Sequence, residues 1–285
     1  MTRAPIPYET SDVTVVVATR NRRERLLETL PRHAAPVIVV DNGSDDGSPE
    51  AIAAAFPHVT MVPLGENRAA AARTAGAELA RTSYVAFADD DSWWEPGSLA
   101  ALAGLFRAHP RAGLLAARVL AGPDRREDPV SAAQARAPLG TPPGAPGPAI
   151  LGFLACSVAV RREDFLAAGG FRPQLRVYGE EALLAVDLAA AGRHLSYVPQ
   201  LTVRHVPLSE GRDPRARRRL EARNRLLTAM LRRPPAVVAR TAAAAWRDDP
   251  RSLADAVRLL PWALRERQPL PPHIEKALVR LADEG

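Results

Sequence analysis

Tyr84-Val85-Ala86-Phe87-Ala88-Asp89-Asp90-Asp91 is the stretch that decides the fold class of this 285-residue chain. Its five apolar residues predict a strand buried on both faces, and the three aspartates would follow at the strand's carboxyl end, where open α/β sheets bind ligands. Adjacent carboxylates repel one another, so a divalent cation carrying a diphosphate would neutralise them. Oxygen ligands favour Mg²⁺ or Mn²⁺, whereas an Asp-rich turn capping the next helix would need no metal.

Three further apolar runs precede this strand, at residues 13–17, 37–40 and 59–62. Segments with helical spacing separate them, and others follow after Pro96 and over residues 180–191. Buried strands that alternate with helices predict a mostly parallel sheet with helices on both faces. The expected fold class is therefore α/β with a Rossmann-like sheet.

The pattern changes in the second half of the chain. Residues 122–148 are rich in proline and glycine and predict a long loop, and residues 195–198 and 201–206 predict two short extended segments. Beyond Pro207 the spacing becomes helical, and a single late helix is predicted to carry an apolar stripe of Leu253, Val257, Leu260 and Leu264.

These patterns predict two parts, a sheet domain over residues 10–210 and a helical extension over residues 211–285. The extension either packs against the domain or lies on a membrane surface as an amphipathic helix, which would give a peripheral membrane contact. Arginines gather over residues 212–225, where they either contact a phosphate or form a solvated helix face. Arg223 beside Asn224 is the phosphate contact that we expect first.

Composition excludes several classes of protein. The net charge is +6, but Lys276 is the only lysine and arginine is abundant throughout, so the charge reflects composition and does not predict a nucleic-acid partner. The single cysteine, Cys156, allows no disulfide within the chain and is expected to be a small buried apolar residue. The N-terminal residues lack the apolar core of a signal peptide and no apolar run is long enough to span a membrane, so we expect a cytoplasmic protein.

A second acidic point follows the second predicted strand, at Asp41. Because parallel strands end at the same edge, Asp41 and the three aspartates should face one crevice. One carboxylate could hold a base or ribose while the others hold a metal against phosphates. The residues after the first strand, 18–22, contain no glycine fingerprint and the chain has no Walker loop, so carboxylates, arginine and metal would bind the nucleotide.

Four segments, 15–22, 37–48, 66–76 and 87–97, together resemble a family 2 glycosyltransferase with the GT-A fold. The resemblance extends through Gly179-Glu180-Glu181 to about residue 207. It implies that a nucleotide diphosphate sugar binds to the residues equivalent to the family's donor site, which are Thr19, Arg20, Asp41, Arg73, Asp89 and Asp90.

The same resemblance implies a metal at Asp91, with His205 near the metal and diphosphate. His205 is then either a ligand or a histidine with ordinary partners at a strand end. The family carries its catalytic base at the second position of a Glu-Asp pair, which here is Glu181 after Glu180. Glutamate keeps the carboxylate and lengthens its reach, although a charge pair favoured by a helix N-terminus explains the same two residues.

The predicted function is inverting transfer of a hexose or deoxyhexose from a nucleotide diphosphate donor to a hydroxyl of a small-molecule, glycan or lipid-linked acceptor. Because Glu181 stands where the family has aspartate, a non-catalytic GT-A-like protein that only binds nucleotide sugars is the alternative. A nucleotidyltransferase shares the acidic metal site, but its glycine- and arginine-rich opening loop is absent. Trp93 and Trp94 either stack on a sugar or belong to the core.

Overall fold

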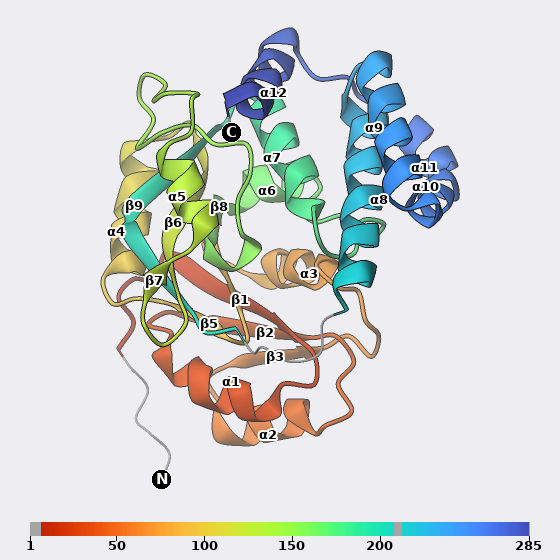
Figure 1. Ribbon diagram of the computed structural model, residues 1–285. Coiled ribbons are helices and arrows are strands. Elements are labelled where there is room, and N and C mark those ends of the chain that lie inside the picture. Colours follow the sequence, from red (N-terminus) through yellow and green to blue (C-terminus); the bar gives the residue numbers. More distant parts are fainter. Residues whose placement is uncertain (1–6, 208–212, 285) are drawn as a thin grey trace.

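The computed structural model describes residues 7–207 and 213–284 and contains one mixed β-sheet flanked by helices (Figure 1). Along the sheet the strand order is β3-β2-β1-β4-β8-β6-β9-β5, and β7 pairs with β6. The sheet therefore joins a first half made of consecutive early strands to a second half whose strands come from later in the chain.

The first half is parallel, as the sequence predicts. Thr19 lies opposite Asp41 in the neighbouring strand, and Ala18 lies opposite Asp89, so the carboxyl ends of these strands meet at one edge. Its elements are β1 (Val13–Thr19), α1 (Arg23–Thr29), a 3₁₀ turn (Leu30–Arg32), β2 (Val37–Asp41), α2 (Ser48–Ala55), β3 (Thr60–Pro63), α3 (Ala71–Leu79) and β4 (Tyr84–Asp89).

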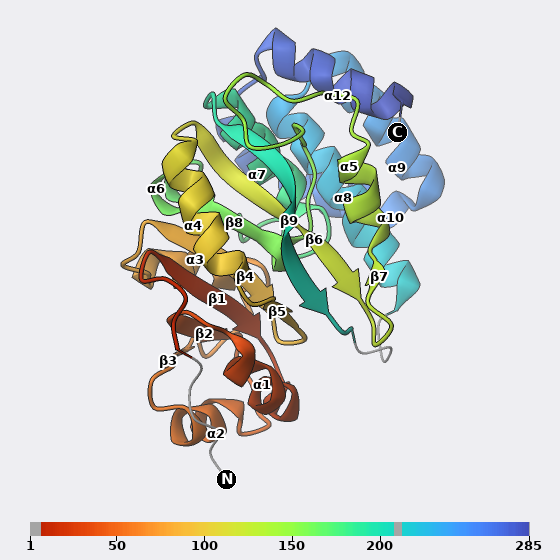
Figure 2. The same cartoon turned by 90° about the vertical axis from the view of Figure 1, so that its left-hand side faces the viewer.

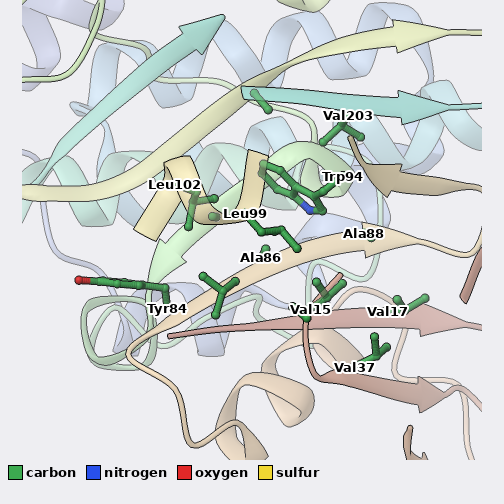
Figure 3. Packing of buried hydrophobic residues seen from close by; sticks show 14 of the residues in the cluster. Val15, Val17, Val37, Tyr84, Ala86, Ala88, Trp94, Leu99, Leu102 and Val203 are labelled. Carbon is green, nitrogen blue, oxygen red and sulfur yellow. The ribbon is translucent and has the colours of Figure 1, made fainter. Parts of the chain in front are cut away.

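Alternate residues of these strands enter two separate apolar clusters. Val15 and Val17 face α4 together with Trp94 and Leu99 (Figure 3), whereas Val16 faces α3. Gly76 lets α3 approach closely, because a Cβ there would lie 2.4 Å from Cγ1 of Val16. Both faces of the sheet are thus covered.

The second half differs from the expected parallel arrangement, because β8 pairs antiparallel with both β4 and β6. The predicted long loop contains β7 and α5, and the two predicted segments form one strand, β9, with an irregular register against β6. Its elements are β5 (Ser92–Trp94), α4 (Ser98–Ala108), β6 (Ala112–Ala121), β7 (Arg126–Glu127), α5 (Pro129–Ala135), a 3₁₀ turn (Ala155–Ser157), β8 (Val158–Arg161), α6 (Arg162–Ala167), α7 (Glu180–Ala190) and β9 (His194–His205).

Trp94 belongs to the core: it is 2% exposed, and its indole nitrogen donates to the Phe87 carbonyl at 3.1 Å. Trp93 is half-buried, and the Arg32 guanidinium lies 4.4 Å from the centroid of its ring. Neither tryptophan lines the cleft described below, so the structure favours the core interpretation over sugar stacking.

Five helices form the described residues after β9 (Figures 1 and 2): α8 and α12 contact α7, and α9, α10 and α11 pack on α8. A third apolar cluster joins Leu183 of α7 to Leu227 of α8, and Arg232 forms an ion pair of 2.5 Å with Asp187. The helices are α8 (Pro214–Arg232), α9 (Pro235–Asp248), α10 (Pro250–Val257), α11 (Leu260–Arg265) and α12 (Pro272–Glu284).

The prediction of an apolar stripe on a single late helix is wrong. Its residues fall on two helices, since α10 ends at Val257 and α11 begins at Leu260. Val257 is 49% exposed and Leu264 is 61% exposed. Within the two described ranges of the chain, no helix combines the length and apolar content that crossing a bilayer requires.

Candidate active site

A cleft of about 890 Å³ lies at the carboxyl ends of β1 and β4. Segments 153–156 and 176–181 and the first turns of α8 also line it. Its wall contains the following residues predicted from sequence: Thr19, Arg20, Arg73, Asp89, Asp90, Asp91, Glu180, Glu181 and His205.

Asp41 is the predicted site residue that the structure does not bring to this wall. It is 1% exposed, and its carboxylate accepts hydrogen bonds from the backbone N–H of Ser44, at 2.9 Å, and from the Ser44 hydroxyl. The next residue, Asn42, lines the cleft instead. Asp41 therefore shapes the turn at the edge of the cleft, and its contact with a nucleobase stays a prediction.

Each of the three aspartates has a different partner. Asp89 forms an ion pair with Arg73 of α3, and Asp90 accepts a hydrogen bond of 3.0 Å from the Thr19 hydroxyl. Asp91 is 5% exposed, and its Oδ1 lies 3.3 Å from Nε2 of His205 at the end of β9. Each of the three carboxylates therefore has its own polar partner, on the sheet edge, on α3 or on β9, which reduces the repulsion between them.

The charges at this wall are coupled. Loss of hydration, and after it the charges of Asp89 and Asp91, raise the pKa of Asp90 to about 7. Burial acts to lower the pKa of His205, but its interaction with Asp91 outweighs that effect and the pKa is raised. The protonation states of Asp90 and His205 therefore both depend on the charges of Asp89 and Asp91.

The residues present fit a divalent cation. Asp91 Oδ1 is buried and forms no well-aligned hydrogen bond with a described residue, and Nε2 of His205 lies 3.3 Å from it, so one cation could bind both atoms. One ligand atom each from Asp89, Cys156 and His205 lie within 4.8 Å of one another. Carboxylate, imidazole and thiolate groups all bind first-row divalent metals.

Sequence reasoning missed the position of Cys156. It is buried as expected, and burial raises the pKa of its thiol well above the ordinary value, yet it also lines the cleft. An isolated cysteine in an apolar stretch gives no signal for this placement. Other lining residues that were missed are Arg22, Asn67, Asp128, Arg176, Tyr178 and Arg217.

Glu180 and Glu181 form a second acidic wall of the cleft, at the start of α7. The backbone before them is strained, because Arg176 and Tyr178 have φ values of 59° and 67° and neither is glycine. Such strain concentrates at functional sites and persists only where surrounding structure enforces it. The segment therefore points to a positioned site more strongly than to a simple helix start.

Burial is the main cause that raises the pKa of both glutamates, and the Glu181 charge raises that of Glu180 further. Glu180 is 4% exposed and its Oε2 has no hydrogen-bond partner among the described residues. Glu181 is half-buried, and its Oε2 accepts from the Gly179 N–H at 3.2 Å. Carboxylates with raised pKa values in a cleft suit proton transfer near neutral pH.

Helix α8 holds the strained segment in place. The buried side-chain amide nitrogen of Asn224 lies 2.7 Å from the Leu175 carbonyl oxygen and 2.8 Å from that of Tyr178. Arg223 donates to the Leu175 carbonyl at 2.9 Å and does not line the cleft, so the expectation that it contacts phosphate is wrong. Arg217 is the arginine of α8 that reaches the cleft, with its guanidinium 5.1 Å from the centroid of the Tyr178 ring.

Comparison with known proteins identifies the family of the chain. The family described as Glycosyl transferase family 2 matches residues 14–166. A Mycobacterium tuberculosis protein, described as N-acetylglucosaminyl-diphospho-decaprenol L-rhamnosyltransferase, is 30% identical over 67% of this chain and 74% of its own. The same match occurs in two strains of that organism.

Solved structures support the fold. The mannosyltransferase PcManGT from Pyrobaculum calidifontis, in complex with GDP-Man and Mn²⁺, matches with a TM-score of 0.56 and 24% identity over 99% of this chain and 79% of its own. S. aureus TarS in complex with UDP-GlcNAc matches with a TM-score of 0.58 and 14% identity over 86% of this chain and 71% of its own. The expected GT-A architecture, with helices after the sheet, is therefore confirmed.

Proposed function

This chain belongs to glycosyl transferase family 2, and from that premise we propose that it transfers a deoxyhexose such as L-rhamnose from a nucleotide diphosphate to a sugar on a polyprenyl diphosphate. One observation carries the proposal: two separate carboxylate groups line one cleft, as the two halves of a transfer reaction require. The relative described as a rhamnosyltransferase supports the choice of sugar and of a lipid-linked acceptor.

The donor would bind along the sheet edge. Thr19 and Arg20 lie at the end of β1 near the expected base and ribose, and Asp41 would fix the neighbouring turn. Arg73 holds Asp89 in place through its ion pair. The donor pocket is thus built by groups whose positions the parallel register already sets.

A divalent ion, Mg²⁺ or Mn²⁺, would neutralise the departing diphosphate when bound. Asp91 and His205 are the residues that would hold it. Without such an ion, the buried Oδ1 of Asp91 forms no well-aligned hydrogen bond with a described residue.

Glu181 would act as the base. Its carboxylate takes the proton from the acceptor hydroxyl as that oxygen attacks the anomeric carbon, and the bond from this carbon to the diphosphate oxygen breaks. One displacement of this kind inverts the anomeric configuration. The raised pKa of Glu181 brings its proton affinity closer to the working pH, where general bases are most effective.

A transfer assay on the full-length protein tests the proposal. Nucleotide sugars are first screened by thermal shift with and without Mn²⁺, and the stabilising donor is then incubated with polyprenyl diphosphate-linked N-acetylglucosamine. We expect metal-dependent release of the nucleoside diphosphate and a product whose anomeric configuration, read by NMR, is inverted. Retention would exclude the single displacement.

Stable donor binding without any release of nucleoside diphosphate would favour the non-catalytic alternative, in which glutamate at position 181 no longer serves as a base. We also propose a cytoplasmic location, which rests on the single cysteine and is checked by cell fractionation.

A further inference from the structure

Resting on the function proposed above, we propose that an apolar groove beside the cleft binds the polyprenyl chain of the acceptor. This side groove has a volume of about 650 Å³, within the range of small-molecule sites. It lies between α5, the segment at 150–153 and the C-terminal end of α12, which are neighbours in both views (Figures 1 and 2). Its wall is formed by Pro129, Val130, Ala133, Gln134, Arg136, Ala137, Pro138, Ile150, Leu151, Gly152, Phe153, Leu281 and Glu284.

The side groove adjoins the active-site cleft. Pro129, Val130 and Phe153 line both spaces. A molecule whose reacting hydroxyl lies in the cleft could therefore reach the groove past these three residues. Because of these shared residues, the groove differs from an isolated depression of the surface.

Hydrogen bonds within the protein hold the wall of the groove in place. The Gln134 side chain is 7% exposed and donates to the Gly152 carbonyl at 2.9 Å, which ties α5 to the opposite segment. Asp128 caps α5 by accepting from the Val130 N–H at 2.8 Å. The wall shared with the cleft is thus fixed by hydrogen bonds that do not involve a ligand.

The chemistry of the wall selects the occupant. Apart from Gln134, whose amide is occupied, its polar side chains are those of Arg136 and Glu284, and both are exposed. A sugar or nucleotide placed there would lose hydration without gaining hydrogen bonds, which is costly. A hydrocarbon chain gains from leaving water and needs no polar partner.

The cleft and the side groove differ in polarity as the two ends of the acceptor do. Arg176 and Arg217 are among the residues that line the cleft, where they can contact a diphosphate, and the wall of the side groove is largely apolar. A polyprenyl diphosphate has the same sequence of a charged head followed by an apolar chain. The geometry therefore assigns the head to the cleft and the first isoprene units to the side groove.

The test measures affinity against chain length. Geranyl, farnesyl and geranylgeranyl diphosphate are titrated into the full-length protein by calorimetry, below their micelle-forming concentrations, with inorganic diphosphate as reference. Burial of hydrocarbon predicts that each added isoprene unit lowers Kd by about fivefold or more until the groove is filled.

Two matched variants on α5 locate the effect. Both Ala133 and Ala135 are exposed, but of the two Ala133 lines the groove, so Ala133→Glu places a charge in the groove wall and Ala135→Glu makes the same change outside it. We expect Ala133→Glu to abolish the dependence on chain length, and Ala135→Glu to keep it. Leu281→Glu on α12 makes the same test from the opposite wall if Ala133→Glu does not fold.

The proposal is overturned if wild-type Kd does not change with chain length, or if the groove variants bind long chains as tightly as the wild type does. Transfer to a short-chain acceptor is measured on the same samples. If Kd does not depend on chain length but sugar transfer is normal, the groove proposal is wrong and the proposed function stands. If Kd depends on chain length but no sugar is transferred, the proposed function is wrong and the groove proposal stands.

Discussion

The two acidic walls of the cleft are built in different ways. The aspartate wall stands on sheet edges, and Arg73, Thr19 and His205 each contact one of its members. The glutamate wall stands on the first turn of α7 after strained backbone, and no glutamate of the pair forms an ion pair with a described residue. The first wall is thus held by strands of the sheet and by α3, whereas the second depends on α8.

If the aspartate wall holds the metal, Asp91→Asn should have the largest effect. Loss of one charged ligand removes several kcal/mol of charge stabilisation, so we expect the transfer rate to fall about 10⁴-fold. Thermal stabilisation by donor plus Mn²⁺ should also disappear, which is measured separately by thermal shift.

Asp124→Asn is the control for this substitution, because Asp124 is an exposed aspartate outside the cleft. It should retain both the rate and the metal-dependent stabilisation. Undiminished stabilisation in Asp91→Asn would show that the metal, if any, is held elsewhere.

Glu181→Gln tests the glutamate wall. Removal of the base should lower kcat about 10³-fold while the KM for the donor stays near the wild-type value. Glu180→Gln is the matched comparison: its raised pKa favours the protonated form, which glutamine resembles, so its loss should be smaller. A larger loss in Glu180→Gln would reverse the roles of the two residues.

Asn224→Ala separates positioning from chemistry. Its amide contacts the carbonyl oxygens before Glu180, so its loss should lower kcat about tenfold and leave those buried acceptors unpaired at a cost of about 1–3 kcal/mol. Donor affinity, measured by calorimetry, should change little, and the pH profile of kcat should shift as Glu181 moves. A parallel loss of donor affinity would contradict the separation of the two walls.

The same contrast explains what the sequence could predict. Thr19 and Asp89 through Asp91 follow apolar strands directly, so local pattern and family resemblance place them at one edge. Asn224, by contrast, acts on carbonyls more than forty residues away, and nothing in its helical surroundings marks that contact. Helix α5 was not predicted, because it lies in a region whose prolines and glycines predict a loop. One of those prolines, Pro129, is in fact the first residue of the helix and follows its N-cap, Asp128.

The smallest expected effect is on the stability of the metal-free protein, through Asp90. Its pKa of about 7 lies above the ordinary value of 3.8, so its stabilising contribution is complete below about pH 4 and is lost as pH rises through 7. The melting temperature without metal should therefore fall between pH 6 and pH 8, since the raised pKa values of Glu180 and Glu181 act in the same direction. Asp90→Asn should reduce this slope without removing it, whereas Asp124→Asn should leave it unchanged. A melting temperature that rises over this interval would show that the aspartate wall is already balanced without a metal.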